Sequence, residues 1–303
     1  MQPCFDLCIP SLVFQASFNF LNMGQTPAKI TKQWADGPFP LIETPRKRRG
    51  VRSFSSKPTV IRITDFLLQI KNPKKEPGAL SAATEMCLIH NVMIRILNCI
   101  YLQAPNVKHD KDIADFTTFM HAFLILLHEH HSNEEKHFFP MLEEYIGTPG
   151  WMEKNVEQHH AFAHGLEGFE EYVKALRAGK ETYDGVKIQK LVDDFAPVLV
   201  EHLSDEIGTF EDLEKFGDKI DWKLWSKKVG EIAVKTAETD HEIPIVVTNM
   251  DNPFEKPVHE AVWPPFPWFV ALMFRWIYLP RHKGAWRFSC CDWHGNPKDL
   301  EFV

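Results

Sequence analysis

The sequence predicts an all-α protein whose centre is an up-down-up-down four-helix bundle. Between residues 81 and 217, four segments carry apolar side chains at every third or fourth position, the period of a helix with one buried face. Short loops with glycine or proline separate these segments, and short loops favour antiparallel neighbours. The composition changes on either side, so we expect a disordered basic N-terminal arm and an aromatic, Pro-rich C-terminal tail.

The bounds of the helices follow from glycine, proline and capping residues. The first helix ends ahead of Pro105, because the residue before a proline disfavours the helical conformation. The third ends at Gly179, a common helix stop. Pro140 lies inside the apolar pattern of the second and predicts a kink or break there. The four bundle helices are expected at residues 81–103, 112–146, 151–179 and 186–216.

Three regions are expected along the chain: an extension with a basic arm at 1–78, the bundle at 79–217, and an additional helix with a tail that wraps the bundle at 218–303. Residues 24–78 contain twelve Lys or Arg against four Asp or Glu and seven prolines, a composition that does not form a core. Within the last region, residues 221–244 are expected to form one helix. The Pro- and Asn-rich stretch that follows, up to residue 265, is expected to be irregular.

Composition and the absence of certain motifs argue against several classes of function. A net charge of −7 over 303 residues argues against general affinity for nucleic acid. The six cysteines form no CxxC pair and no zinc-finger spacing, so a reducing, cytoplasmic compartment is expected, with Cys87 as a buried thiol and Cys290-Cys291 as a reduced pair. No nucleophile-elbow, P-loop or dinucleotide motif is present. The oligomeric state cannot be inferred from these features.

Three short segments admit alternative interpretations. The apolar residues 1–22 lack a basic start and are interpreted as an extension without a fold of its own, ahead of Met23. The basic run 46–49 is either solvated charge or a nuclear import signal. The aromatic segment 266–280 is too short for an integral membrane span and carries Arg275, so we expect it to pack on the bundle, with a peripheral membrane contact as the alternative.

Residues 128–140, HEHHSNEEKHFFP, carry the chemistry. His130 and Glu134 lie one turn apart on a helix face shared with apolar residues, so both are expected to point into the core. Each of the other helices places a histidine on its apolar stripe: His90, His159 and His202, the last followed one turn later by Glu206. A single such histidine is more often a satisfied core residue, but four helices sharing the pattern favours a metal site.

Imidazole and carboxylate ligands together suit iron, and suit zinc or manganese less well. The candidate metal ligands are His90, His130, Glu134, His159, His202 and Glu206. Buried carboxylates are costly unless a cation pairs with them, and this strengthens the metal interpretation.

On these residues, about 80–217 of the chain resembles the hemerythrin-like, HHE cation-binding family, and looser phrases resemble uncharacterised fungal members. The FFP run after the HxxxE spacing is also similar. The resemblance implies two non-haem iron ions bridged by Glu134 and Glu206. It also implies four histidines as terminal ligands and an open position for dioxygen.

Two positions depart from the family pattern. The residue four after His159 is Ala163, which cannot bind metal, although His160 and His164 have the HxxxH spacing on a stripe that continues to acidic residues. We therefore prefer His159. The position five after His202 is Ile207, and Glu206 continues the inward stripe. One iron is thus expected to lack a protein ligand, which water, a substrate or a rotated His164 would replace.

The remaining histidines of the second helix receive no ligand role. His128, His131 and His137 crowd the same helix, and we interpret His137 as exposed or half-buried, with orientation of Glu134 by His137 as the alternative. The functions that fit are a di-iron protein that binds dioxygen, nitric oxide or iron for sensing or storage, a di-iron oxidoreductase activating dioxygen or peroxide, or a metal-free helical scaffold.

Overall fold

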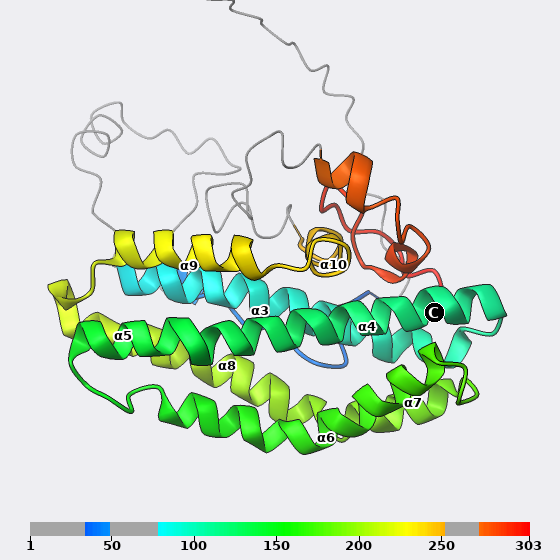
Figure 1. Ribbon diagram of the computed structural model, residues 1–303, viewed down its shortest axis with the longest axis horizontal. Coiled ribbons are helices and arrows are strands. Elements are labelled where there is room, and N and C mark those ends of the chain that lie inside the picture. The colour runs from blue at the N-terminus through cyan, green and yellow to red at the C-terminus, as the bar shows by residue number, and fades with distance from the viewer. Residues whose placement is uncertain (1–33, 49–77, 252–272) are drawn as a thin grey trace, which may run out of the picture. The chain divides into compact units, whose positions relative to one another are not determined.

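The structure, a computed structural model, describes residues 34–48, 78–251 and 273–303 of the chain (Figure 1). In these ranges every regular element is a helix, and β-type pairing is limited to an isolated bridge between Cys291 and Pro297. The predicted all-α class is therefore confirmed for this part of the chain.

Four long helices form the body: α3 (Gly78–Gln103), α4 (Asp110–Asn133), α6 (Glu153–Arg177) and α8 (Ala196–Asp212). Helix α3 contacts α4, α4 contacts α6, α6 contacts α8, and α8 returns to α3, so the four surround a common interior (Figure 1). Apolar side chains fill that interior, among them Phe123, Phe162 and Leu199. A 3₁₀ turn, η1 (Ala104–Asn106), ends α3 at the expected Pro105.

The second predicted helix does not stop at Pro140, although its regular α-helical turns are interrupted just before it. Helix α4 passes into a π-helical segment, η2 (Glu134–Phe138), and then into α5 (Phe139–Ile146). Within this segment the backbone N–H of Phe139 bonds to the carbonyl of Glu134, five residues earlier. Proline has no N–H to donate, and a wider turn before it accommodates this loss without ending the helix.

The prediction of one continuous helix at 186–216 is wrong. The segment forms α7 (Gly185–Asp193) and then α8, with an interruption at Asp194 and Phe195. Pro197 lies in the first turn of α8 and is suited to that place, because the first N–H groups of a helix have no intrahelical partner. The 3₁₀ segment η3 (Leu213–Lys219) follows α8 and contains Gly217 at a φ of 55°, a left-handed value.

Part of the basic arm is ordered against the bundle, contrary to the expectation for residues 1–78. Residues 34–44 and the short α1 (Pro45–Arg48) pack along α3, where Ala35 is fully buried. The side chain of Asn98 donates to the carbonyls of Ala35 and Phe39 at 3.0 and 2.8 Å and accepts from Phe39 N at 2.9 Å. The side chain of Asn91 likewise accepts from the backbone N–H of Ile42 at 2.8 Å and donates to the carbonyl of Ile42 at 2.9 Å.

The region expected as one helix at 221–244 contains α9 (Trp222–Thr236) and α10 (Glu242–Val247), separated by residues 237–241. The second of these extends into the stretch expected to be irregular. Helix α9 contacts α3 and α4, and α10 contacts the same two helices.

The tail adds η4 (Phe274–Tyr278), a π-helical turn, and η5 (Ala285–Phe288), which contacts α3 and α4. Phe288 packs on Phe116 of α4 with ring centroids 4.7 Å apart. Trp286 is buried, but Trp276 is 69% exposed, contrary to the packing expected for it. Trp263, Trp268 and Phe269 lie outside the described residues.

Of the described helices, only the stretch Gly78–Asn106 has the length and apolar character that a membrane crossing requires. Most of it is covered by the rest of the protein, as the central helix of a bundle is.

Candidate metal centre

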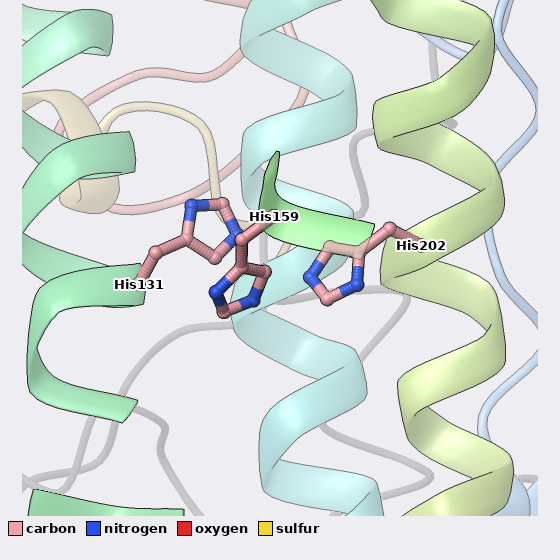
Figure 2. A group of neighbouring side chains, drawn as sticks. All are labelled: His131, His159 and His202. Carbon is pink, nitrogen blue, oxygen red and sulfur yellow. The ribbon is translucent and has the colours of Figure 1, made fainter. Parts of the chain in front are cut away.

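Seven side chains that bind metals well meet in the interior between the four long helices. Helix α3 supplies one, the end of α4 two, the π-helical segment one, α6 one and α8 two. These residues are His90, His130, His131, Glu134, His159, His202 and Glu206. Figure 2 shows His131, His159 and His202 with their rings turned toward one another from three different helices.

The donor atoms divide into two groups, in each of which all donor atoms lie within 4.8 Å of one another. One group has three imidazoles, those of His131, His159 and His202. The other has two imidazoles, from His90 and His130, and the two carboxylates. Nε2 of His90 lies 3.1 Å from Nε2 of His130.

Each carboxylate approaches one histidine of each group. Oε1 of Glu134 lies 2.8 Å from Nε2 of His130, while its Oε2 lies 3.7 Å from Nε2 of His159. Oε2 of Glu206 lies 3.5 Å from Nε2 of His90 and 3.7 Å from Nε2 of His202. The two carboxylates therefore join the three-histidine group to the two-histidine group.

Neighbouring groups fix the orientation of two of the imidazoles. Nδ1 of His90 lies 2.8 Å from the carbonyl oxygen of Leu203, which can only accept, so this Nδ1 donates. Nδ1 of His159 lies 2.6 Å from Oε1 of Glu135. When Nδ1 carries the proton, Nε2 is left as a bare lone pair, the form that binds a metal.

The buried acceptor atoms of the site indicate that it is suited to a cation. Glu134 and Glu206 are 0% exposed, and within the described residues no N–H or O–H is aimed at their oxygens in hydrogen-bond geometry, even where Nε2 of His130 lies 2.8 Å from Oε1 of Glu134. Nε2 atoms of His131, His159 and His202 also lack a hydrogen-bond partner there. Buried polar atoms are nearly always paired, so this concentration of unpaired acceptors calls for a ligand that supplies positive charge.

Burial drives all of these groups toward their neutral forms. It lowers the pKa of His130 to about 3 and, with the charge of neighbouring histidines, that of His202 to about 2. Burial also raises the pKa of Glu134 and of Glu206, and in each case another carboxylate raises it further. Neutral imidazoles suit metal binding, whereas protonated carboxylates do not, so a bound cation has to displace the carboxyl protons.

The structure brings together all six residues that the sequence analysis named as ligands. His159 is buried, while its alternatives His160 and His164 are exposed, and so is His137. Ala163 is exposed too, so the third helix offers this site one imidazole.

His131 was not among the predicted ligands, but this residue is 8% exposed and belongs to the three-histidine group. It gives this group its third imidazole. A signal was present, since Leu124 and Leu127 lie seven and four residues before it and are buried on the same stripe.

A helical bundle with five histidines and two glutamates in its core defines a carboxylate–histidine metal-binding protein. The chain belongs to the hemerythrin HHE cation-binding domain family, whose model matches residues 83–212 and so includes all seven of these residues. It is also 34% identical over 279 residues to the dimeric xanthone biosynthesis cluster protein R11 of Cryptosporiopsis sp. (strain 8999), covering 92% of this chain and 96% of that protein. No solved structure matches the chain.

Proposed function

We propose that the centre holds two non-haem iron ions and binds a small diatomic molecule, dioxygen or nitric oxide, with helices α3, α4, α6 and α8 in up-down-up-down order around it. The observation that carries this proposal is the placement of Glu134 and Glu206, each between one histidine of each group. Two cations close together repel one another, and shared carboxylates offset that repulsion. Zinc or manganese would fit the same donors less well.

The two groups of histidines give the two iron positions different roles. His131, His159 and His202 would hold one ion, and His90 and His130 the other, with both carboxylates shared. The two-histidine position has one protein donor fewer, so it is the one that admits an outside ligand. Bound iron would supply reversible electron transfer to that ligand.

Apolar rings line the three-histidine side. Phe162 lies 5.2 Å from His131 between ring centroids, and Phe139 lies 6.0 Å from His159. These rings exclude water from the histidines and keep the imidazoles neutral.

The test is metal analysis of full-length protein expressed in iron-supplemented medium, with visible spectra taken without oxygen, under air and with nitric oxide. Wild type should hold two iron ions per chain and show a new absorption band with each ligand. His131→Ala should hold one ion or none, and His164→Ala, an exposed histidine on the same bundle, should match wild type. Equal metal loss in both variants, or zinc alone with no spectral response, would contradict the proposal.

A second candidate function is oxidation of an organic substrate at the same centre. It is favoured by the relative, whose name refers to a dimeric xanthone biosynthesis cluster. The measurement is dioxygen consumption by the iron-loaded protein with a reductant, with and without a xanthone. Consumption that depends on the xanthone and exceeds one equivalent would favour the enzyme, whereas a single equivalent would favour the binding protein.

A further inference from the structure

A second buried polar cluster lies between helix α3 and the C-terminal tail, away from the seven metal-binding residues. Cys99 on α3 and Cys290 and Cys291 in the tail are at most 1% exposed, and the described free cysteines include all three. The proposed metal centre uses none of these thiols. Arg95, one turn before Cys99 on α3, is also fully buried.

The three sulfur atoms belong to one buried cluster. Sγ of Cys290 lies 3.8 Å from Sγ of Cys291, and Cys99 is near enough to Cys290 for each to shift the pKa of the other. Asn249 fixes this arrangement, because its Oδ1 accepts from the backbone N–H of Cys290 at 3.1 Å and from the thiol of Cys99 at 3.9 Å. The tail segment thus presents Cys290 to a thiol of α3.

Two cationic side chains influence the same thiols. The charge of Arg95 lowers the pKa of both tail cysteines, and the charge of Lys298 lowers that of Cys99. Nζ of Lys298 is held in place by the carbonyls of Trp286 and Arg287 at 3.0 and 3.1 Å. A buried cation close to sulfur favours the thiolate, the nucleophilic form of cysteine.

The three thiols differ in acidity as a result. Burial would raise the pKa of Cys290, but hydrogen bonds from Cys291 and Cys99 and the charge of Arg95 hold it well below its usual range. Burial and the contact with Cys290 raise the pKa of Cys99. The contact with Cys290 and burial raise that of Cys291. Cys290 is therefore the most acidic of the three thiols and the one best suited to attack an oxidant.

We propose that Cys290 and Cys99 form a reversible disulfide when the protein meets hydrogen peroxide, so that the tail is covalently attached to helix α3. Cys291 is the poorer partner for geometric reasons. The Cα atoms of adjacent residues are about 3.8 Å apart, whereas disulfides usually join Cα atoms about 4.4–6.8 Å apart. Cys99 belongs to a different element and does not have this restriction.

The reaction balances with peroxide as the oxidant. The Cys290 thiolate attacks one peroxide oxygen, the O–O bond breaks, and the products are a sulfenic acid and hydroxide, which takes up a proton to become water. The Cys99 sulfur then attacks the Cys290 sulfur, its thiol proton is transferred to the departing hydroxyl, and a second water leaves. Two thiols are oxidised to one disulfide, and one peroxide is reduced to two waters.

Trypsin separates the cysteines concerned, which makes the product easy to identify. Cleavage after Arg95 and Lys108 releases Cys99 in one peptide, and cleavage after Arg287 and Lys298 releases Cys290 with Cys291 in another. Cys87 remains in a third peptide, so it serves as an internal control.

Full-length protein is treated with hydrogen peroxide, blocked with an alkylating reagent, digested and analysed by mass spectrometry without reductant. The expected product joins peptides 96–108 and 288–298 and disappears with dithiothreitol. Cys99→Ser and Cys290→Ser should abolish it, while Cys291→Ser and the control Cys87→Ser should retain it. Oxidised wild type should also unfold at a Tm several degrees above reduced wild type, and Cys99→Ser should show no such difference.

Three outcomes would overturn the proposal. The first is a disulfide confined to peptide 288–298, which would join Cys290 to Cys291. The second is peroxide treatment that yields only sulfinic or sulfonic acid at Cys290. The third is wild type in which all three thiols remain reduced while Tm stays unchanged.

Discussion

Helix α3 contributes to two buried polar clusters, and these clusters differ in how their charge is balanced. In the part of the chain that the structure describes, burial and other carboxylates shift the pKa of Glu134 and of Glu206, and no lysine or arginine is among the causes. The thiol cluster has Arg95 and Lys298 beside it. The metal centre therefore needs a cation from outside, whereas the thiol cluster has its cations within the chain. The two clusters thus differ in where the positive charge that balances their acidic groups comes from.

The largest expected effect comes from removing one of the shared carboxylates. Glu134→Ala should reduce the bound metal from two ions to one or none, as measured by elemental analysis. The variant should also lose the stabilisation that metal gives, about 4 kcal/mol when the free metal is 1,000-fold above its Kd. The oxidised disulfide should form in this variant as in wild type, because the thiol cluster has its own cations.

The size-matched variant Glu134→Gln sharpens this test. It removes a buried acid that no cationic side chain balances and leaves no large cavity, so the metal-free variant should be at least as stable as metal-free wild type in urea. A metal-free Glu134→Gln protein that is much less stable than wild type would show that the carboxylate has a structural partner within the chain.

The next effect is on the pH dependence of the metal-free protein. The folded pKa of His130 is about 3 and that of His202 about 2, against 6.5 in the unfolded chain, so stability should fall as the pH drops below 6.5. The raised pKa values of Glu134 and Glu206 act in the opposite sense. Protonated carboxyls stabilise the folded state near their ordinary pKa of 4.5, and this contribution is lost as the pH rises through the folded values.

The histidines outnumber the carboxylates, so metal-free protein should be most stable near pH 6.5 in urea unfolding. Each histidine contributes up to about 1.4 kcal/mol per pH unit below that point. Metal holds the carboxylates ionised, so the decline above pH 6.5 should disappear in metal-loaded protein. A metal-free protein whose stability is flat between pH 5 and 8 would contradict the assignment of these groups as buried and neutral.

A smaller effect, on the free energy of unfolding, is expected from substituting Asn98, which lies on the side of α3 that contacts the arm. Asn98→Ala removes the partner of three backbone groups of residues 35 and 39, two of which belong to Phe39. The free energy of unfolding should fall by about 3 kcal/mol, because buried backbone groups lose their hydrogen bonds. Metal content and disulfide formation should both stay at wild-type levels. Loss of either would show that the arm positions α3 for one of the clusters.

The smallest effect is expected at Glu135, whose Oε1 lies 2.6 Å from Nδ1 of His159. Glu135→Gln keeps the shape of the side chain but removes the charge that orients this imidazole. Metal affinity should fall about 10-fold to 100-fold while the stoichiometry of two ions is retained. A matched control is Glu157→Gln, an exposed carboxylate on the same helix as His159, which should leave affinity unchanged.

The two clusters also differ in how far the sequence predicts them. The candidate ligands of the metal centre recur at helical spacing along apolar stripes, so the sequence predicts six of the seven. His131 was missed because it adjoins His130, and a regular helix would separate two adjacent side chains by about 100°. The thiol cluster has no such periodicity, since Cys99 and Cys290 meet only through the packing of the tail on α3.

The same distinction applies to the fold. The long helices and their glycine and proline stops are local features, and their class was predicted correctly. The arm at residues 34–48 was expected to be disordered because its composition is basic and Pro-rich. Its order depends on Asn91 and Asn98, which lie on a distant part of the chain and bind its backbone. Composition alone does not record such partners.

The π-helical segment between α4 and α5 has a consequence for how this protein tolerates change. A turn with one extra residue resets the rotation of the helix by about 100°, so the apolar face of α5 is set independently of the face of α4. Phe139 and Leu142 are buried beyond the segment, as Leu127 is before it. Deleting one residue between 135 and 137 would therefore turn the buried face of α5 away from the buried face of α4. Substitutions that change only the packing around α5 should leave the direction of the His130 and His131 imidazoles unchanged.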